Sequence, residues 1–144
     1  MICDRSDGLA FDLLRNYKDK YSKELSFFIL STEKNKIVSQ RAKKHKIKCY
    51  QGVSDKLSFI KDYLSDKFPQ QKDAFKKIIY LGNDLNDYSS MRYCGFSVAP
   101  SDAHPEIKKI ASKVLDKKGG EGFVRLFVEE LLIENNLDIY SLLL

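Results

Sequence analysis

Five short apolar runs divide the chain, and each stops at a glycine, a proline or a cluster of polar residues. Continuous apolar runs of this length are typical of strands that are buried on both faces of a parallel sheet. The sequence therefore predicts five strands, of which the last is very short. They are expected at residues 26–30, 47–51, 78–81, 96–99 and 114–115.

Helical periodicity fills the segments between these runs. Apolar side chains recur every three or four positions after Ser54 and after Pro105, and a long helical stripe begins at Phe123. Ser54 is expected to cap its helix and Pro105 to take a first helical position. Strands that alternate with helices predict a three-layer α/β/α sandwich around a mostly parallel, Rossmann-like sheet. The expected boundaries are one domain over residues 1–135 and an apolar tail over residues 136–144.

The composition is that of a folded domain, with 144 residues of which 43% are hydrophobic and 31% are charged. This length is enough to bury one sizeable core. No apolar run approaches the roughly 20 residues that cross a bilayer, so no membrane association is expected. The N-terminus lacks the pattern of a signal peptide, and the three cysteines lie far apart. These features favour a cytoplasmic protein with reduced thiols.

The net charge of +5 comes largely from seven Lys and Arg residues between positions 34 and 48. The favoured interpretation of this segment is the solvated face of a helix, and the alternative is the steering of an anionic substrate. Nucleic acid is not an expected partner, because no aromatic residues interleave with these charges to stack on bases.

Residues 82–87, which follow the third apolar run, concentrate polar side chains. They read Gly-Asn-Asp-Leu-Asn-Asp and begin where the predicted strand ends. Open α/β sheets place ligand sites beyond the carboxyl ends of their strands, and Mg²⁺ prefers oxygen ligands. A metal or phosphate site is therefore favoured over the alternative, a helix start in which Asn or Asp is the N-cap.

Polar side chains also follow the first two apolar runs. Ser31 and Thr32 come after the first run, and Asp55 and Lys56 come after the second. Because the carboxyl ends of parallel strands meet at one edge of a sheet, these groups are expected close to residues 82–87. A hydroxyl and an ammonium would hold phosphoryl oxygens there, while carboxylates would hold Mg²⁺. The arrangement predicts a phosphate-handling site.

Seven short motifs, taken in their order and spacing, resemble the haloacid dehalogenase (HAD) superfamily. The resemblance is strongest to its capless branch, which includes 3-deoxy-D-manno-octulosonate 8-phosphate (KDO 8-phosphate) phosphatase. The same module occurs at the C-terminus of some acylneuraminate cytidylyltransferases, which are CMP-sialic acid synthetases, and the motif details look closer to that version. The motifs occupy residues 7–9, 30–33, 41–43, 51–56, 82–87, 98–106 and 118–125.

The resemblance implies a catalytic role for two residues. The hydroxyl of Ser31 would bind the phosphoryl group, with Thr32 beside it at the substrate, and the ammonium of Lys56 would neutralise an aspartyl-phosphate intermediate. These assignments follow from the positions that Ser31 and Lys56 take in the family's motifs and agree with the phosphate-handling site expected from the residues themselves.

The resemblance also implies the cofactor. Asn83, Asp84 and Asp87 match the acidic motif that completes a Mg²⁺ site in the family. This chain has Asn83 at the motif's first acidic position, which is usually Asp. A neutral amide binds Mg²⁺ more weakly than a carboxylate, so Asp84 and Asp87 are the stronger expectations.

Six further residues are implied at the substrate. In this branch the segment between positions 119 and 125 reaches into a neighbour's active site in a homotetramer, which would also explain why the last helix is apolar on both faces. The residues implied are Arg5, Asp7 and Gly8 near the start of the chain, and Gly119, Gly120 and Arg125 near its end.

The sequence departs from the family at its first motif. The family has an apolar strand that ends in Asp-x-Asp-Gly, in which the first Asp is the nucleophile, and this sequence contains no Asp-x-Asp. Asp4 and Asp7 are separated by two residues, and only Ile2 and Cys3 separate Asp4 from the first residue, so Asp4 is not expected to replace the nucleophile. The first strand of the family is expected to be missing.

Two functions are therefore expected from the resemblance. The first is a Mg²⁺-dependent phosphatase domain that acts on a sugar-acid phosphate, either KDO 8-phosphate or a nonulosonate 9-phosphate, through an aspartyl-phosphate. The second is a non-catalytic oligomerisation module that accompanies a cytidylyltransferase domain. The missing nucleophile leads us to expect that the chain alone is inactive.

Overall fold

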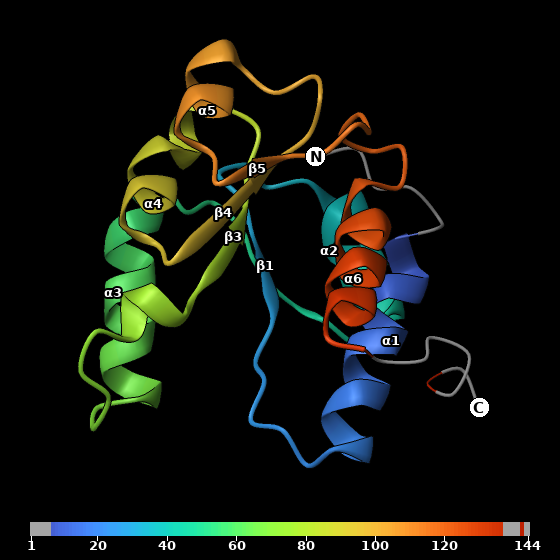
Figure 1. The fold of residues 1–144 in the computed structure, drawn as a ribbon. Coiled ribbons are helices and arrows are strands. Elements are labelled where there is room, and N and C mark those ends of the chain that lie inside the picture. Colours follow the sequence, from blue (N-terminus) through green and yellow to red (C-terminus); the bar gives the residue numbers. More distant parts are fainter. Residues whose placement is uncertain (1–6, 137–141, 143–144) are drawn as a thin grey trace. The chain divides into compact units, whose positions relative to one another are not determined.

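The computed structural model describes residues 7–136 and 142 of the chain and consists of two compact units. The first unit combines Met1–Gln51 with Gly120–Leu144, and the second is Gly52–Gly119. Both units are of the α/β class, and both contain parallel strands, as the alternation of strands and helices predicts (Figure 1).

The first unit holds a two-stranded parallel sheet. Its strands pair in the register Phe28 with Lys48 through Leu30 with Tyr50. The helix between them begins at Asn35, whose side chain accepts a hydrogen bond from the backbone N–H of Ile37 at 2.9 Å. The elements are α1 (Asp7–Lys20), β1 (Phe28–Leu30), α2 (Lys36–Lys44), β2 (Lys48–Tyr50) and α6 (Phe123–Glu134).

Helices α1 and α6 pack side by side, although they lie at opposite ends of the chain (Figure 1). Leu13 of α1 is fully buried. Val128 and Leu132 of α6 are almost fully buried. Ile133 of α6 is 59% exposed, so the apolar stripe is indeed wider than the buried face. The predicted contact between this helix and another subunit stays a prediction.

The second unit holds a three-stranded parallel sheet in the order β3-β4-β5. Helix α4 contacts the strands β3 and β4. It also contacts α3 and α5 and lies between these two helices (Figure 1). The elements are α3 (Lys56–Lys67), η1 (Ala74–Lys77), β3 (Ile79–Leu81), η2 (Leu85–Asp87), α4 (Tyr88–Tyr93), β4 (Phe96–Ala99), α5 (Pro105–Ile110) and β5 (Lys113–Val114).

The core of the second unit is a small cluster of apolar side chains that joins α4, β4 and α5. Met91, Ala99, Ala103 and Ile107 form it, and the half-buried ring of Tyr80 packs against it. Small residues on the strand let α4 and α5 approach the sheet closely, as close-packed interiors require. This packing holds the end of β3 and the segment after it against a rigid support.

The strands are found where the apolar runs predict them, within one or two residues at each end. The cap of α3 was predicted at the wrong residue, because Asp55 and not Ser54 accepts the hydrogen bond from the helix, at 3.0 Å from the backbone nitrogen of Ser58. No helix within residues 7–136 is both long and apolar enough to cross a membrane. Arg5 and the tail residues 137–141 and 143–144 lie outside the described residues.

Candidate functional site

The segment after β3 forms a tight turn that begins a short helix. Asp84 is the N-cap of η2, and its carboxylate accepts a hydrogen bond from the backbone N–H of Leu85 at 2.7 Å. Asp87 reaches back to the start of the same turn, so the two carboxylates complete a capping box. The helix start, which was the alternative interpretation of residues 82–87, is therefore present.

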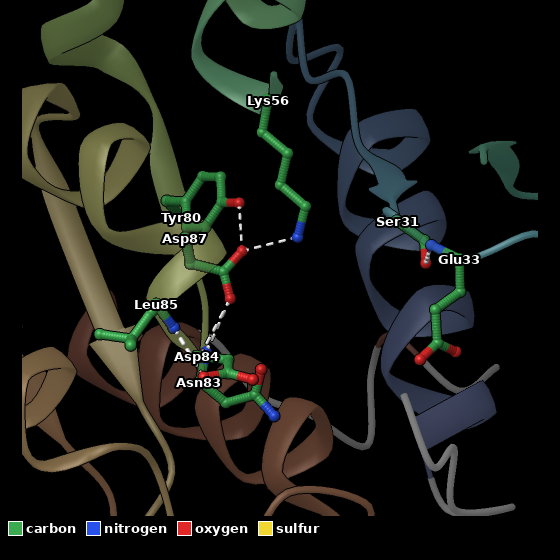
Figure 2. A network of polar contacts seen from close by, with 8 residues as sticks. All are labelled: Ser31, Glu33, Lys56, Tyr80, Asn83, Asp84, Leu85 and Asp87. Atoms are coloured by element: carbon green, nitrogen blue, oxygen red, sulfur yellow. Dashed lines mark hydrogen bonds and ion pairs between the residues drawn. The ribbon is translucent and has the colours of Figure 1, made fainter. Parts of the chain in front are cut away.

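Asp87 is the centre of the polar contacts in the second unit (Figure 2). Its side chain is only 5% exposed. One carboxylate oxygen, Oδ1, accepts hydrogen bonds from the ammonium of Lys56 at 2.7 Å and from the hydroxyl of Tyr80 at 2.6 Å. The other oxygen, Oδ2, accepts from the backbone N–H of Asn83 at 3.0 Å and of Asp84 at 3.3 Å. Two donors on each oxygen use the full acceptor capacity of a carboxylate.

Lys56 and Asp87 form a buried ion pair whose side chains are 8% and 5% exposed. Lys56 is the first residue of α3, and the cap at Asp55 fixes where that helix starts. The ammonium donates one of its three hydrogens to Asp87, and among the described residues no second acceptor is found for it. Burial strengthens the pull of the ammonium on a negative charge, because little water screens it.

Tyr80 belongs to this site and was not predicted, because its position in the third apolar run indicated only a buried strand residue. Burial raises the pKa of its hydroxyl well above the usual range, and the neighbouring charge of Asp87 acts in the same direction. The phenol is therefore a hydrogen-bond donor at any physiological pH. The sequence did offer one indication of this role, because the hydroxyl of a tyrosine on a buried strand generally requires a hydrogen-bond partner.

Gly82 makes the approach of Asp87 to the end of β3 possible. A Cβ added at Gly82 would lie 2.8 Å from the Cβ of Asp87 and 2.8 Å from the sulfur of Met91. Contacts this short do not occur between real side chains, so any larger residue at position 82 would displace Asp87. The glycine is required by packing, since the site has no room for a side chain there.

The metal roles predicted for Asn83, Asp84 and Asp87 stay predictions. Asp87 accepts four hydrogen bonds and is buried, whereas the side chains of Asn83 and Asp84 are exposed, although the carboxylate of Asp84 also accepts the capping hydrogen bond from Leu85. Among residues 7–136 and 142, no three His, Cys, Asp or Glu side chains gather in a way that could hold a metal ion. Mg²⁺ in proteins usually keeps several waters and is held by one or two carboxylates together with substrate phosphates, so few protein ligands are needed.

Ser31 lies at the carboxyl end of β1 in the first unit, as predicted. It is buried, its backbone N–H donates to the carbonyl of Tyr50 at 2.9 Å, and its Oγ accepts from the backbone N–H of Glu33 at 3.1 Å. The hydroxyl hydrogen of Ser31 is not used in that contact and is available to a phosphoryl oxygen. Thr32 follows it and is half-buried.

The other predicted substrate residues of the first unit lie at the ends of its helices. Gly8 is on the first turn of α1, directly after Asp7, where a Cβ would overlap the imidazole of His45. Arg125 is on the first turn of α6, and its Nε donates to Glu129 at 2.9 Å. Gly120 has a positive φ of 82°, which favours glycine.

Gly119 ends the second unit and is held by a residue that was not predicted. Its backbone N–H donates to the carboxylate of Asp102 at 2.8 Å, just as the neighbouring N–H of Ser101 donates to the carbonyl of Lys117 at 2.9 Å. These contacts tie the start of the glycine-rich segment to the loop that follows β4. The role of Gly119 in substrate binding stays a prediction.

The structure thus brings Lys56, Asn83, Asp84 and Asp87 together within one unit, and adds Tyr80 to them (Figure 2). Ser31 belongs to the other unit. The roles assigned to these residues by resemblance stay predictions. What the geometry of the second unit provides is a buried ammonium, fixed by a fully hydrogen-bonded carboxylate, at the carboxyl end of a parallel strand. Such a group stabilises negative charge.

The sequence matches the haloacid dehalogenase-like hydrolase family over residues 6–127. It is 32% identical over 151 residues to a KDO 8-phosphate phosphatase of Yersinia pestis, an alignment that covers 92% of this chain and 79% of the relative. It is 33% identical over 125 residues to the KDO 8-phosphate phosphatase of Escherichia coli K12, covering 82% of this chain and 64% of that protein. The chain therefore spans less than two thirds of the second relative.

Solved structures share the fold. A HAD family hydrolase from Streptomyces avermitilis superposes with a TM-score of 0.78 at 32% identity, over 89% of this chain and 68% of that one. KDO 8-phosphate phosphatase from Moraxella catarrhalis, solved with magnesium, phosphate and KDO, superposes with a TM-score of 0.80 at 26% identity, over 96% and 75%. These matches confirm the predicted HAD-like α/β fold. The chain belongs to the haloacid dehalogenase-like hydrolase family, in which its relatives include KDO 8-phosphate phosphatases.

Proposed function

We propose that this chain is the phosphoryl-handling part of a Mg²⁺-dependent phosphatase for sugar-acid phosphates, with KDO 8-phosphate or a nonulosonate 9-phosphate as the substrate class. Its membership of a hydrolase family and the names of its relatives support the reaction type. The observation that carries the proposal is the buried Lys56–Asp87 pair, whose ammonium has no second acceptor among the described residues and can donate to an anion.

In the proposed reaction Lys56 stabilises the charge that develops as the phosphoryl group moves. A buried cation that is fixed before the reaction is effective here, because it does not have to reorganise when the charge forms. The resemblance implies that Ser31 and Thr32, which belong to the other unit, bind the phosphoryl group, and that role stays a prediction. The nucleophile would be the first Asp of an Asp-x-Asp motif, as the resemblance implies, and this sequence contains no such motif.

Mg²⁺ is part of the proposal and is supported by the solved relative that contains magnesium and phosphate. Asn83 and Asp84 are the donors that the chain would offer to the ion, while Asp87 is engaged elsewhere. A bound Mg²⁺ would neutralise charge on the phosphoryl group. We expect the chain to bind Mg²⁺ weakly unless carboxylates from another segment complete the site.

The test is phosphate release from KDO 8-phosphate and from a nonulosonate 9-phosphate, with and without Mg²⁺. It compares the chain with a fusion that adds, before Asp7, the part of the Yersinia pestis relative that precedes the matched region. We expect no release by the chain, release by the fusion, and at least about a hundredfold loss in the Lys56→Met fusion. Lys67→Met, an exposed lysine on the same helix, is the matched control.

A folded fusion that releases no phosphate would contradict the phosphatase proposal and favour the alternative, a non-catalytic oligomerisation module that accompanies a cytidylyltransferase domain. The absence of Asp-x-Asp and the exposed apolar Ile133 on α6 are the observations behind that alternative. Native mass spectrometry decides its assembly, because both the tetramer and a complex with a cytidylyltransferase predict masses above that of the monomer. A chain that is monomeric both by itself and when mixed with a cytidylyltransferase would contradict the oligomerisation module.

A further inference from the structure

Tyr80 occupies a position that links the sheet of the second unit to its ion pair. It is the middle residue of β3, where it pairs with Ser97 of β4. Its ring packs against the apolar cluster that includes Met91 and Ile107, so the direction of its hydroxyl is set by the core. The hydroxyl ends 2.6 Å from Oδ1 of Asp87 (Figure 2).

The same oxygen of Asp87 receives the ammonium of Lys56 at 2.7 Å. The backbone N–H groups of Asn83 and Asp84 hold the other oxygen, at 3.0 and 3.3 Å, and by themselves would let the carboxylate tilt about that oxygen. Tyr80 removes this freedom, because its rigid ring determines where Oδ1 lies. The location of Oδ1 in turn determines where the ammonium of Lys56 lies, since Asp87 is its acceptor.

The phenol suits this role chemically. Its O–H donates to the carboxylate of Asp87, and its ring brings no charge of its own into the ion pair. Tyr80 therefore contributes a donor of fixed direction to the oxygen that also receives the Lys56 ammonium.

We propose that Tyr80 is a positioning residue that fixes the Lys56 ammonium, through Asp87, in the orientation that receives a phosphoryl oxygen. The proposal rests on the proposed function for the identity of the anion, because Lys56 is assigned there to the phosphoryl group. The link from Tyr80 to Lys56 does not depend on turnover, and it is measurable in the chain as it stands.

The test compares Tyr80→Phe with Tyr88→Phe. Both substitutions remove one hydroxyl and keep a ring that packs against the same apolar cluster. Within the described residues, the contact found for Tyr88 is the guanidinium of Arg92 over its ring, 6.0 Å from the centroid, and the Phe variant retains that geometry. Tyr88 is therefore the matched control for loss of a hydroxyl without loss of a contact to Asp87.

The first measurement is nitrogen-15 NMR relaxation of the lysine side chains, which reports motion of the Lys56 ammonium directly. We expect the Lys56 ammonium to be restricted in the unmodified chain and in Tyr88→Phe, and mobile in Tyr80→Phe. The melting temperature of the Tyr88→Phe control should equal that of the unmodified chain. A purely structural contribution of Tyr80 would lower the melting temperature without changing the order of this one ammonium. Equal order in Tyr80→Phe and the unmodified chain would overturn the proposal.

The second measurement is the affinity for inorganic phosphate, by calorimetry. Tyr80 does not contact the anion itself, so its loss is expected to have the effect of one ordinary hydrogen bond, a dissociation constant about two- to tenfold higher in Tyr80→Phe. The same substitution in an Asp87→Asn background should have little further effect, because Tyr80 acts through that carboxylate. An undiminished effect in this background would overturn the proposal. If the unmodified chain binds no phosphate, the proposed function fails, and the relaxation measurement still decides the role of Tyr80.

If Tyr80→Phe does not fold, the chain labelled with 3-fluorotyrosine answers the same question, because the label keeps both ring and hydroxyl. The Tyr80 fluorine resonance should shift in Lys56→Arg, which changes the other donor to Oδ1 but keeps the counter-charge of Asp87, while the Tyr88 resonance should not. A Tyr80 resonance that is unchanged by Lys56→Arg would show that the two residues are not coupled and would overturn the proposal.

Discussion

At the scale of single residues, the partners of a side chain decide its chemistry more than its type does. Asp84 and Asp87 stand in one short polar segment, yet Asp84 is exposed and Asp87 is buried with four donors around it. The first is open to solvent ions, whereas the second is committed to Lys56. Residue type alone does not distinguish these two carboxylates, because both are aspartates in the same polar segment.

Lys56→Met is expected to destabilise the protein strongly, because it leaves Asp87 buried without its counter-charge. Breaking one side of a buried ion pair typically lowers the free energy of unfolding by about 3–5 kcal/mol. Urea denaturation, followed by circular dichroism, measures the change. Lys67→Met, on the exposed end of the same helix, should alter stability by less than about 0.5 kcal/mol. A loss below about 1 kcal/mol in Lys56→Met would contradict the buried pairing.

Gly82→Ala is expected to lower stability by about 1–3 kcal/mol, because its Cβ would overlap Asp87 and Met91 at 2.8 Å. Gly119→Ala is the matched control. The nearest atoms to a Cβ there are 3.6 Å away, and Gly119 has no positive φ, so the site accommodates a methyl group. Denaturant melts of both variants make the comparison. Equal effects at the two glycines would show that the close contact at Gly82 is relieved without strain.

At the scale of single elements, the start of each helix is decided by which side chain reaches a free backbone N–H. Ser54 and Asp55 are adjacent, and both residue types are good N-caps. Asp55 is the cap because its carboxylate reaches both the backbone N–H of Ser58, at 3.0 Å, and its hydroxyl, at 2.8 Å. The cap sets the phase of α3 and thereby determines that Lys56 turns inward.

Asp55→Ala is expected to lower the melting temperature by roughly 2–5 °C at about pH 7, through loss of the cap. The hydrogen bond from the backbone of Ser58 lowers the pKa of Asp55, so this contribution is present above the ordinary pKa of 3.8 and is lost as the pH falls through the lower folded value. The difference between Asp55→Ala and the unmodified chain should therefore shrink in strong acid. Calorimetric melts across this range measure it.

Asp66→Ala is the control for this prediction, because Asp66 is exposed near the other end of α3 and caps nothing there. Its effect on the melting temperature should be near zero or slightly stabilising, since a negative charge is unfavourable close to the C-terminus of a helix. A pH-independent effect of Asp55→Ala would indicate that lost helix propensity, and not the charged cap, is responsible.

At the scale of the whole molecule, the first unit is assembled from both ends of the chain. Helix α6 is far from α1 in sequence, and the two pack together, so the unit depends on a long-range contact. The second unit is a continuous segment with its own sheet and core. The prediction of a single domain over residues 1–135 stays a prediction.

Val128→Asp is expected to expose α1 to solvent, because it buries a charge in α6 at a position that is 1% exposed. Amide hydrogen exchange, resolved by peptide mass spectrometry, should show at least about tenfold faster exchange in α1. Ile133→Asp, at a 59% exposed position of the same helix, should leave α1 protected if the chain is a monomer. Unchanged protection of α1 in Val128→Asp would show that α1 does not depend on α6.

The sequence by itself determined the class of fold and the order of its elements, because hydrophobic period and strand-end chemistry are local properties. The apolar run at residues 78–81 indicated β3, and the polar segment after it indicated a site, as the structure confirms for the strand. Lys56 and Asp87 were both identified from their motifs and expected at the same edge of the sheet, but nothing in the sequence indicated that they would form an ion pair.

Only the tertiary structure decided the partners of these residues. Lys56 and Asp87 are 31 positions apart in the chain and form an ion pair. The hydroxyl of Tyr80, on β3, donates to the same oxygen of Asp87. Contacts of this kind depend on how a helix packs against a sheet, which residue types alone do not specify. In the folded chain Asp87 accepts hydrogen bonds from one ammonium, one phenol and two backbone amides, partners that the sequence did not indicate. Its role as a metal ligand stays a prediction.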